Sequence, residues 1–180
     1  MLKRSLYLLV AATFAVLAVP AQAARVEGGT TASQGVMRCG GNHFLRLGGS
    51  EVHFTTYALR NFDASTAISI NRMRVFDGPG NVLFDSASST LPPSDSGLLG
   101  PGNNSLGPNQ SVLFNTLDFL PFLPDTNRPL QMEIQWSAAR RVVTLDAITV
   151  RISRERNPGT GMQLEERGRH AVECSTISLK

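Results

Sequence analysis

Helical periodicity is missing from the sequence after residue 23. No stretch there keeps apolar residues at three- to four-residue spacing for three turns, which a surface helix needs in order to bury one face. A parallel sheet of alternating strands and helices is therefore excluded, and the chain is expected to be all-β.

A strong excess of charge is also missing. Lys3 and Arg4 belong to a leader described below, and without them the 17 basic side chains become 15 against 14 acidic ones, a net charge of +1. Overall charge therefore predicts neither nucleic acid nor an anionic membrane surface as a partner. Five arginines cluster near the C-terminus, where they either face an anionic partner or form a solvated strand face: Arg151, Arg154, Arg156, Arg167 and Arg169.

Histidine is scarce, with three in the whole chain: His43, His53 and His170. None of them forms H-E-x-x-H, H-x-H or a Cys-His pair at ligand spacing, so the sequence predicts no metal site and no cofactor. His43 and His53 could meet across a hairpin centred on Gly48 and Gly49, but two imidazoles are more often ordinary strand residues. The sequence has no G-x-S-x-G motif and no evident pair of carboxylates on strands, so it predicts no catalytic residues.

A leader opens the chain. Lys3 and Arg4 precede an apolar run over residues 6–19, and Ala21 and Ala23 then supply a small-x-small peptidase site. Because the run is too short to span a bilayer, it is interpreted as a secretory signal peptide with cleavage after Ala23. We expect a periplasmic or secreted protein with no membrane span after cleavage.

Export would place the two cysteines, Cys39 and Cys174, in an oxidising compartment, where an isolated pair is usually bridged. The sequence therefore predicts a disulfide that ties the first strand to the last. A redox-active pair would need C-x-x-C spacing, which is absent, and two free buried thiols are the remaining alternative.

Short apolar runs separated by Gly, Pro, Asn and Asp fill the chain from residue 36. The clearest strand lies at 130–136, where apolar and polar residues alternate. Strands are expected over residues 44–47, 52–58, 68–75, 82–84, 111–119, 130–136, 142–153 and 171–179, with a hairpin turn at 77–81 and a short helix at 162–169. We predict an antiparallel two-sheet β-sandwich of about seven to nine strands, immunoglobulin-like, forming one domain over residues 36–180 after a flexible segment at 24–35.

Two loops are unusual for a compact domain. Residues 86–109 are rich in Ser, Pro and Gly and show no periodicity. Residues 119–128 are apolar and interrupted by Pro, so they either close one end of the core or project an apolar patch toward a partner. The candidate partner-binding residues of this second loop are Phe119, Leu120, Phe122 and Leu123.

Part of the chain resembles a known family. Residues 59–63 contain an Arg-Asn-x-Asp turn, residues 68–77 form a strand ending in Phe-Asp, and Gly80 lies in the hairpin that follows. These features look like those of an uncharacterised family of small exported bacterial β-sandwiches, and the layout is similar to that of the sensory rhodopsin transducer domain. The resemblance covers roughly residues 55–152 and implies an interaction module without catalytic residues. The chain departs from it by an insertion at 86–104 and by its cysteine pair.

Together these features favour an exported, non-enzymatic module that recognises a protein or glycan through residues 86–109 and 119–128. One alternative is a hydrolase or lyase acting on polysaccharide or the cell wall, for which two carboxylates and an arginine in one pocket of a sheet face are expected. The other is a structural subunit of a surface assembly, joined by strand addition at an exposed sheet edge.

Overall fold

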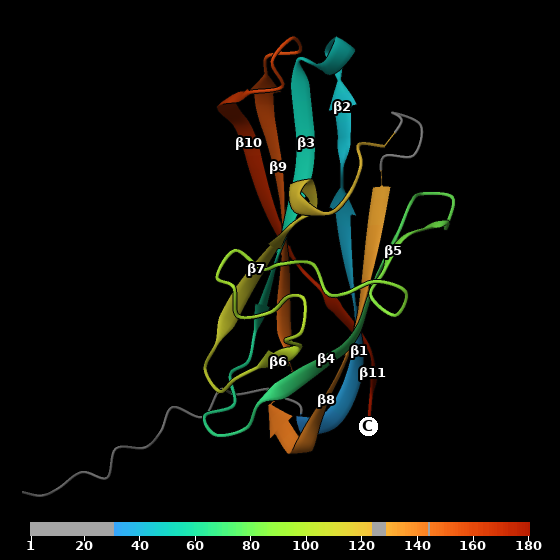
Figure 1. Ribbon diagram of the computed structural model, residues 1–180. Coiled ribbons are helices and arrows are strands. Elements are labelled where there is room, and N and C mark those ends of the chain that lie inside the picture. The colour runs from blue at the N-terminus through green and yellow to red at the C-terminus, as the bar shows by residue number, and fades with distance from the viewer. Residues whose placement is uncertain (1–30, 124–128, 144) are drawn as a thin grey trace, which may run out of the picture.

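The computed structural model describes residues 31–123, 129–143 and 145–180. These residues form a sandwich of two antiparallel sheets, which confirms the predicted fold class (Figure 1). The described residues contain eleven strands, more than the seven to nine expected. The strand expected at 44–47 is present as β2 (Phe44–Arg46). The additional strands arise because residues 31–42 and β6 (Ser105–Leu106) lie outside the predicted ranges, and the strand expected at 171–179 divides between two strands.

Sheet A contains six strands in the order β11-β1-β8-β4-β5, with β6 paired to β4. Their bounds are β1 (Thr31–Asn42), β4 (Ile68–Phe76), β5 (Val82–Asp85), β8 (Pro129–Val143) and β11 (Ser175–Leu179). The alternation predicted at 130–136 is confirmed, since the four apolar residues of that run on β8 are at most 4% exposed and lie in the main core. The predicted turn at 77–81 also joins β4 to β5, and the Asp77 carboxylate closes it by accepting a hydrogen bond from the backbone N–H of Asn81 at 2.7 Å.

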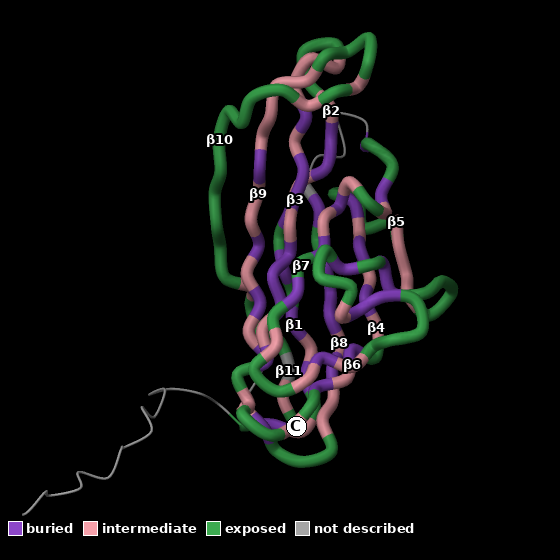
Figure 2. The backbone as a smooth tube through the Cα atoms, turned by 60° about the vertical axis from the view of Figure 1, so that its left-hand side comes forward, coloured by how far each residue is buried: buried purple, intermediate pink, exposed green. Residues whose placement is uncertain are grey.

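Sheet B has the order β10-β9-β3-β2, with β7 paired to β3. Its longer strands are β3 (Glu51–Arg60), β7 (Ser111–Asn115), β9 (Asp146–Arg156) and β10 (Gln163–Glu173), and two 3₁₀ turns, η1 (Leu47–Gly49) and η2 (Thr116–Asp118), flank β3 and β7. The short helix predicted at 162–169 is wrong, because residues 163–169 belong to β10. From Leu164 onward every β10 residue is exposed (Figure 2), so pairing with β9 maintains the strand and no buried face imposes an alternating pattern.

The first strand starts earlier than expected. β1 begins at Thr31 and pairs with β8, so residues 31–35 are strand residues where a flexible segment was predicted. Gly35 in this stretch lies against Trp136, and a Cβ at Gly35 would come within 2.7 Å of the indole Nε1. The glycine there permits close packing. The signal peptide predicted at 1–23 and residues 24–30 lie outside the described residues.

The long loop at 86–109 is packed onto the sandwich. Leu91, Leu99 and Leu106 are buried in the main core, between 0% and 7% exposed. Ser94 stabilises the loop internally: its hydroxyl accepts from the backbone N–H of Leu99 at 3.0 Å and donates to the Leu99 carbonyl at 2.9 Å. Part of the segment expected to recognise a partner therefore covers the core, while most of its residues are exposed.

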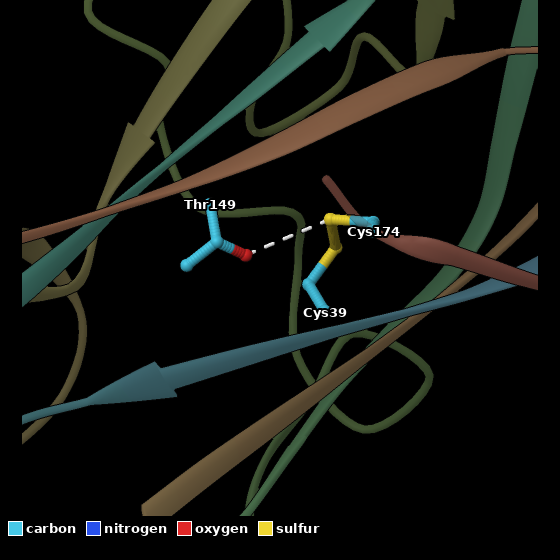
Figure 3. The surroundings of a disulfide bond; sticks show 3 residues. All are labelled: Cys39, Thr149 and Cys174. Atoms are coloured by element: carbon cyan, nitrogen blue, oxygen red, sulfur yellow. Dashed lines mark hydrogen bonds between the residues drawn. A yellow bond between two sulfur atoms is a disulfide. The ribbon is translucent and has the colours of Figure 1, made fainter. Parts of the chain in front are cut away.

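A disulfide joins Cys39 to Cys174, as predicted (Figure 3). Cys39 lies on β1 of sheet A, and Cys174 lies where the chain passes from β10 in sheet B to β11 in sheet A. Thr149 of β9 lies beside the bridge, with its hydroxyl 3.6 Å from the Cys174 sulfur. The bond therefore fixes the last crossover of the chain to its first strand. No helix of the described residues is long and apolar enough to cross a membrane.

Candidate functional site

One end of sheet B carries polar side chains on the face that elsewhere packs against sheet A. Side chains alternate along β3, so Glu51, His53, Tyr57 and Leu59 share one face. Tyr57 and Leu59 lie in the main core, whereas Glu51 and His53 occupy the end of the strand next to η1, at the top of Figure 1. One face of β3 therefore belongs to the hydrophobic core at one end of the strand and to a polar surface at the other.

A cavity of about 380 Å³ lies on this polar surface, between β1, β3, β9 and β10. We call it the arginine pocket. The side chains that define it are Asn42, His53, Arg151, Ser153, Arg169 and His170. None of the described residues that line it is acidic, so the pocket is cationic.

Arg151 is the feature that distinguishes this pocket. Its side chain is partly buried, and its Nε is buried without a hydrogen-bond partner. Every other arginine of the described residues makes at least one hydrogen bond or ion pair there. Because a partly buried charge without a counter-charge costs free energy, Arg151 is suited to an anion supplied from outside the chain.

Two consecutive glycines, Gly40 and Gly41, allow β1 to pack closely against Arg151 and Tyr57. A Cβ at Gly40 would lie 2.8 Å from an Nη of Arg151, and one at Gly41 would collide with the hydroxyl of Tyr57. The Tyr57 hydroxyl is buried and, among the described residues, also has no hydrogen-bond partner. Burial raises the pKa of Tyr57 above its ordinary value, against the opposing effect of the Arg151 charge, so the phenol stays protonated and remains a donor. Two unsatisfied donors thus approach β1 at consecutive residues.

The remaining walls are held in place by their neighbours. His53 stacks on Phe44 with ring centroids 4.4 Å apart, and its Nε2 lies 3.0 Å from the Glu51 carboxylate. Across the strands, Ser153 pairs in register with His53, and His170 pairs with Arg151. At the rim, Arg169 is neutralised by Glu166 through two hydrogen bonds of 3.0 Å. Arg151 therefore supplies the uncompensated positive charge.

A second cavity, of about 440 Å³, lies next to η1. We call it the glutamate pocket, lined by Leu47, Ser50, Glu51, Glu155 and Arg167. Glu155 is ion-paired with Arg167 at 2.5 Å, and Glu51 faces Glu155 directly across β3 and β9. Two carboxylates and an arginine in one pocket are the combination expected of the hydrolase or lyase alternative.

The five arginines that suggested an anionic partner do not form one surface. Only Arg151 and Arg169 line the arginine pocket. Arg154 lies over the ring of Phe54 at 5.2 Å and pairs with Glu166 at 3.8 Å, and the other two lie elsewhere: Arg156 over the Phe122 ring and Arg167 in the glutamate pocket.

The apolar segment predicted to bind a partner mostly closes the core. Leu120 and Leu123 are core residues, 7% and 9% exposed, and Phe119 packs edge-on against Phe84 at 5.1 Å. Phe122 alone of the four presents a substantial exposed surface, 38% of its area. The part of this loop at 124–128 lies outside the described residues.

His43 and His53 do not meet. Phe44, one residue on from His43, pairs in register with His53. His43 is instead buried beneath Phe122, with ring centroids 4.7 Å apart. Its Nε2 lies 3.1 Å from the Leu120 carbonyl and must donate to it, so Nδ1 accepts from the Thr116 hydroxyl at 3.0 Å. Burial lowers the pKa of His43 to about 4, which keeps the ring neutral at pH 7.

Sequence reasoning singled out Arg151, His53 and His170 but did not bring them together. It passed over Tyr57 and Asn42, and the one clue was the Gly40–Gly41 pair, which indicates close approach of backbone to another group. The described residues contain no cluster of three or more His, Cys, Asp or Glu side chains that could hold a metal ion. No family model, curated protein or solved structure matches the chain. The resemblance to small exported β-sandwiches therefore stays a prediction.

Proposed function

We propose that the protein is an exported, non-enzymatic binding module that captures its ligand, a protein or glycan, through an anionic group held in the arginine pocket. The observation that supports this most is Arg151, a partly buried guanidinium that lacks any counter-charge among the described residues. The neighbouring Tyr57 hydroxyl adds a second donor without an acceptor. Buried polar groups are nearly always hydrogen-bonded, so an unsatisfied guanidinium that lines a cavity points to a ligand or an ion.

The pocket replaces the two loops as the favoured binding surface. Residues 86–109 and 119–123 contribute several core side chains, and a loop that must stay packed on the core is less free to adapt to a partner. The arginine pocket combines a rigid sheet with fixed donors, which lowers the entropic cost of binding. Export is supported by the disulfide, since such bonds persist in oxidising compartments.

The test is an NMR titration that measures the binding of sodium glucuronate to the mature protein, with glucose as the uncharged comparison. A charge-assisted hydrogen bond contributes about 1.5–3 kcal/mol, so Arg151→Gln should weaken glucuronate binding about tenfold or more. Arg60→Gln is the matched control, because Arg60 pairs with Asp146 at the opposite end of β3 and carries the same charge. Equal binding by the two variants would refute the assignment.

The hydrolase or lyase alternative is favoured by one specific observation, the glutamate pocket with its two carboxylates and Arg167. Release of reducing ends from an acidic polysaccharide, lost in Glu155→Gln, would support it. Strand addition is less favoured because of the exposed edge strand β10, which carries four charged side chains at 165–169 and two register irregularities. Both features disfavour the pairing of an edge strand with another chain.

A further inference from the structure

The arginine pocket and the glutamate pocket are adjoining subsites on one sheet face. His53 faces Ser153, and Glu51 faces Glu155, across the same pair of strands. Residues two apart on a strand point to the same face and lie about 7 Å apart along it. Arg167 reaches the second row from β10, where it contacts Glu155. A ligand longer than one small ion can therefore contact both pockets.

The charges of the two subsites are opposite. Arg151 leaves the first with an uncompensated positive charge, whereas the second contains two carboxylates, Glu51 and Glu155, and one guanidinium, Arg167, an excess of one negative charge. A chain with an anionic group on every unit would place its second charge where the carboxylates outnumber the guanidinium and Arg167 is already paired with Glu155, which disfavours polyuronates, polyphosphates and nucleic acids. The second subsite instead suits neutral hydroxyl groups, because carboxylates accept hydrogen bonds from them and a guanidinium donates to them.

The lining of the glutamate pocket suits a sugar. Ser50, Glu51, Glu155 and Arg167 all carry hydrogen-bonding groups, and Leu47 is the one apolar residue. A sugar ring would therefore find a hydrogen-bond partner for several of its hydroxyls here.

We propose that the ligand is an acidic oligosaccharide in which one uronic acid is joined to a neutral sugar, with the carboxylate on Arg151 and the neutral sugar between Glu51, Glu155 and Arg167. This inference rests on the proposed function of the arginine pocket. It adds the identity of the second unit, which the arginine pocket by itself leaves open.

The experiment is an NMR titration of the mature protein with four probes: glucuronate, a glucuronate linked to one xylose, galacturonate and digalacturonate. The xylose-bearing acid should bind about tenfold tighter than glucuronate, the gain expected from one or two added hydrogen bonds to charged groups. Digalacturonate should bind no tighter than galacturonate. Glu155→Gln should remove most of the gain from xylose and strengthen digalacturonate binding, while Glu173→Gln, an exposed acid at the far end of β10, should change neither.

The outcomes separate the two proposals. If glucuronate binds and depends on Arg151 but xylose adds nothing, or if digalacturonate binds tightest, the inference about the second unit is overturned and the proposed function stands. If no acid binds, or if all of them bind Arg151→Gln as well as the unaltered protein, the proposed function is overturned and the inference with it. Thermal unfolding of each variant checks that Glu155→Gln, which breaks an exposed ion pair, leaves the fold intact.

Discussion

Loss of the disulfide should remove a large share of the stability of this domain. The bond joins residues 135 apart in sequence, and the chain-entropy relation assigns a loop of that length about 5 kcal/mol at 25 °C. A domain of this kind is typically stable by only about 5–15 kcal/mol, so the reduced protein should be marginal. The part that should loosen first is β11, a five-residue edge strand that the bridge holds against β1.

Urea unfolding of the mature protein with and without reductant measures this effect. The unfolding free energy should fall by about 3–5 kcal/mol on reduction, and the variant Cys39→Ala/Cys174→Ala should show the same loss without responding to reductant. A difference below about 1 kcal/mol would refute the reasoning, since the bond would then not constrain the unfolded chain as the loop length requires.

Three further predictions concern the core. The pKa of His43 falls from 6.5 to about 4 on folding, so the unfolded chain binds more protons than the folded chain between these pH values. Urea titrations should therefore show that the free energy of unfolding is at its full value above pH 6.5 and falls by about 3 kcal/mol toward pH 4. His43→Gln should not show this loss. Leu99→Ala should lower the free energy of unfolding by about 2–5 kcal/mol, whereas Leu47→Ala, at an exposed position, should lower it very little. An equally small loss for Leu99→Ala would indicate that the loop at 86–109 is not packed on the core. Gly41→Ala should lower Tm by inserting a methyl against a buried hydroxyl, whereas Gly159→Ala, which is exposed, should not.

Features that depend on neighbouring residues could be predicted from the sequence. The alternation at 130–136 records a strand with one buried face, and the turn at 77–81 follows from Asp, Gly and Pro within five residues. The part of β10 before residue 171 could not be predicted, because both its faces are exposed and its conformation is imposed by pairing with β9. The burial of Leu91 and Leu99 could not be predicted from the sequence either, because the apolar residues of an irregular loop have no regular spacing even when they fill the core.

The candidate site depends on register between distant strands. His53 and Ser153 are 100 positions apart in the chain and become neighbours only through the β3–β9 pairing. The lack of a counter-charge for Arg151 is likewise invisible in a sequence where acids and bases nearly balance. The Gly40–Gly41 pair carried the local clue, but without a partner strand it indicated only that some group comes close.

The Nε–H resonance of Arg151 shows whether this guanidinium binds an anion. The resonance is assigned by its loss in Arg151→Gln and followed while glucuronate is added to the mature protein. This resonance should shift and saturate as the ligand is added, while the Nε–H resonance of Arg60 should stay in place. Glucuronate binding with the Arg151 resonance unmoved would contradict the account.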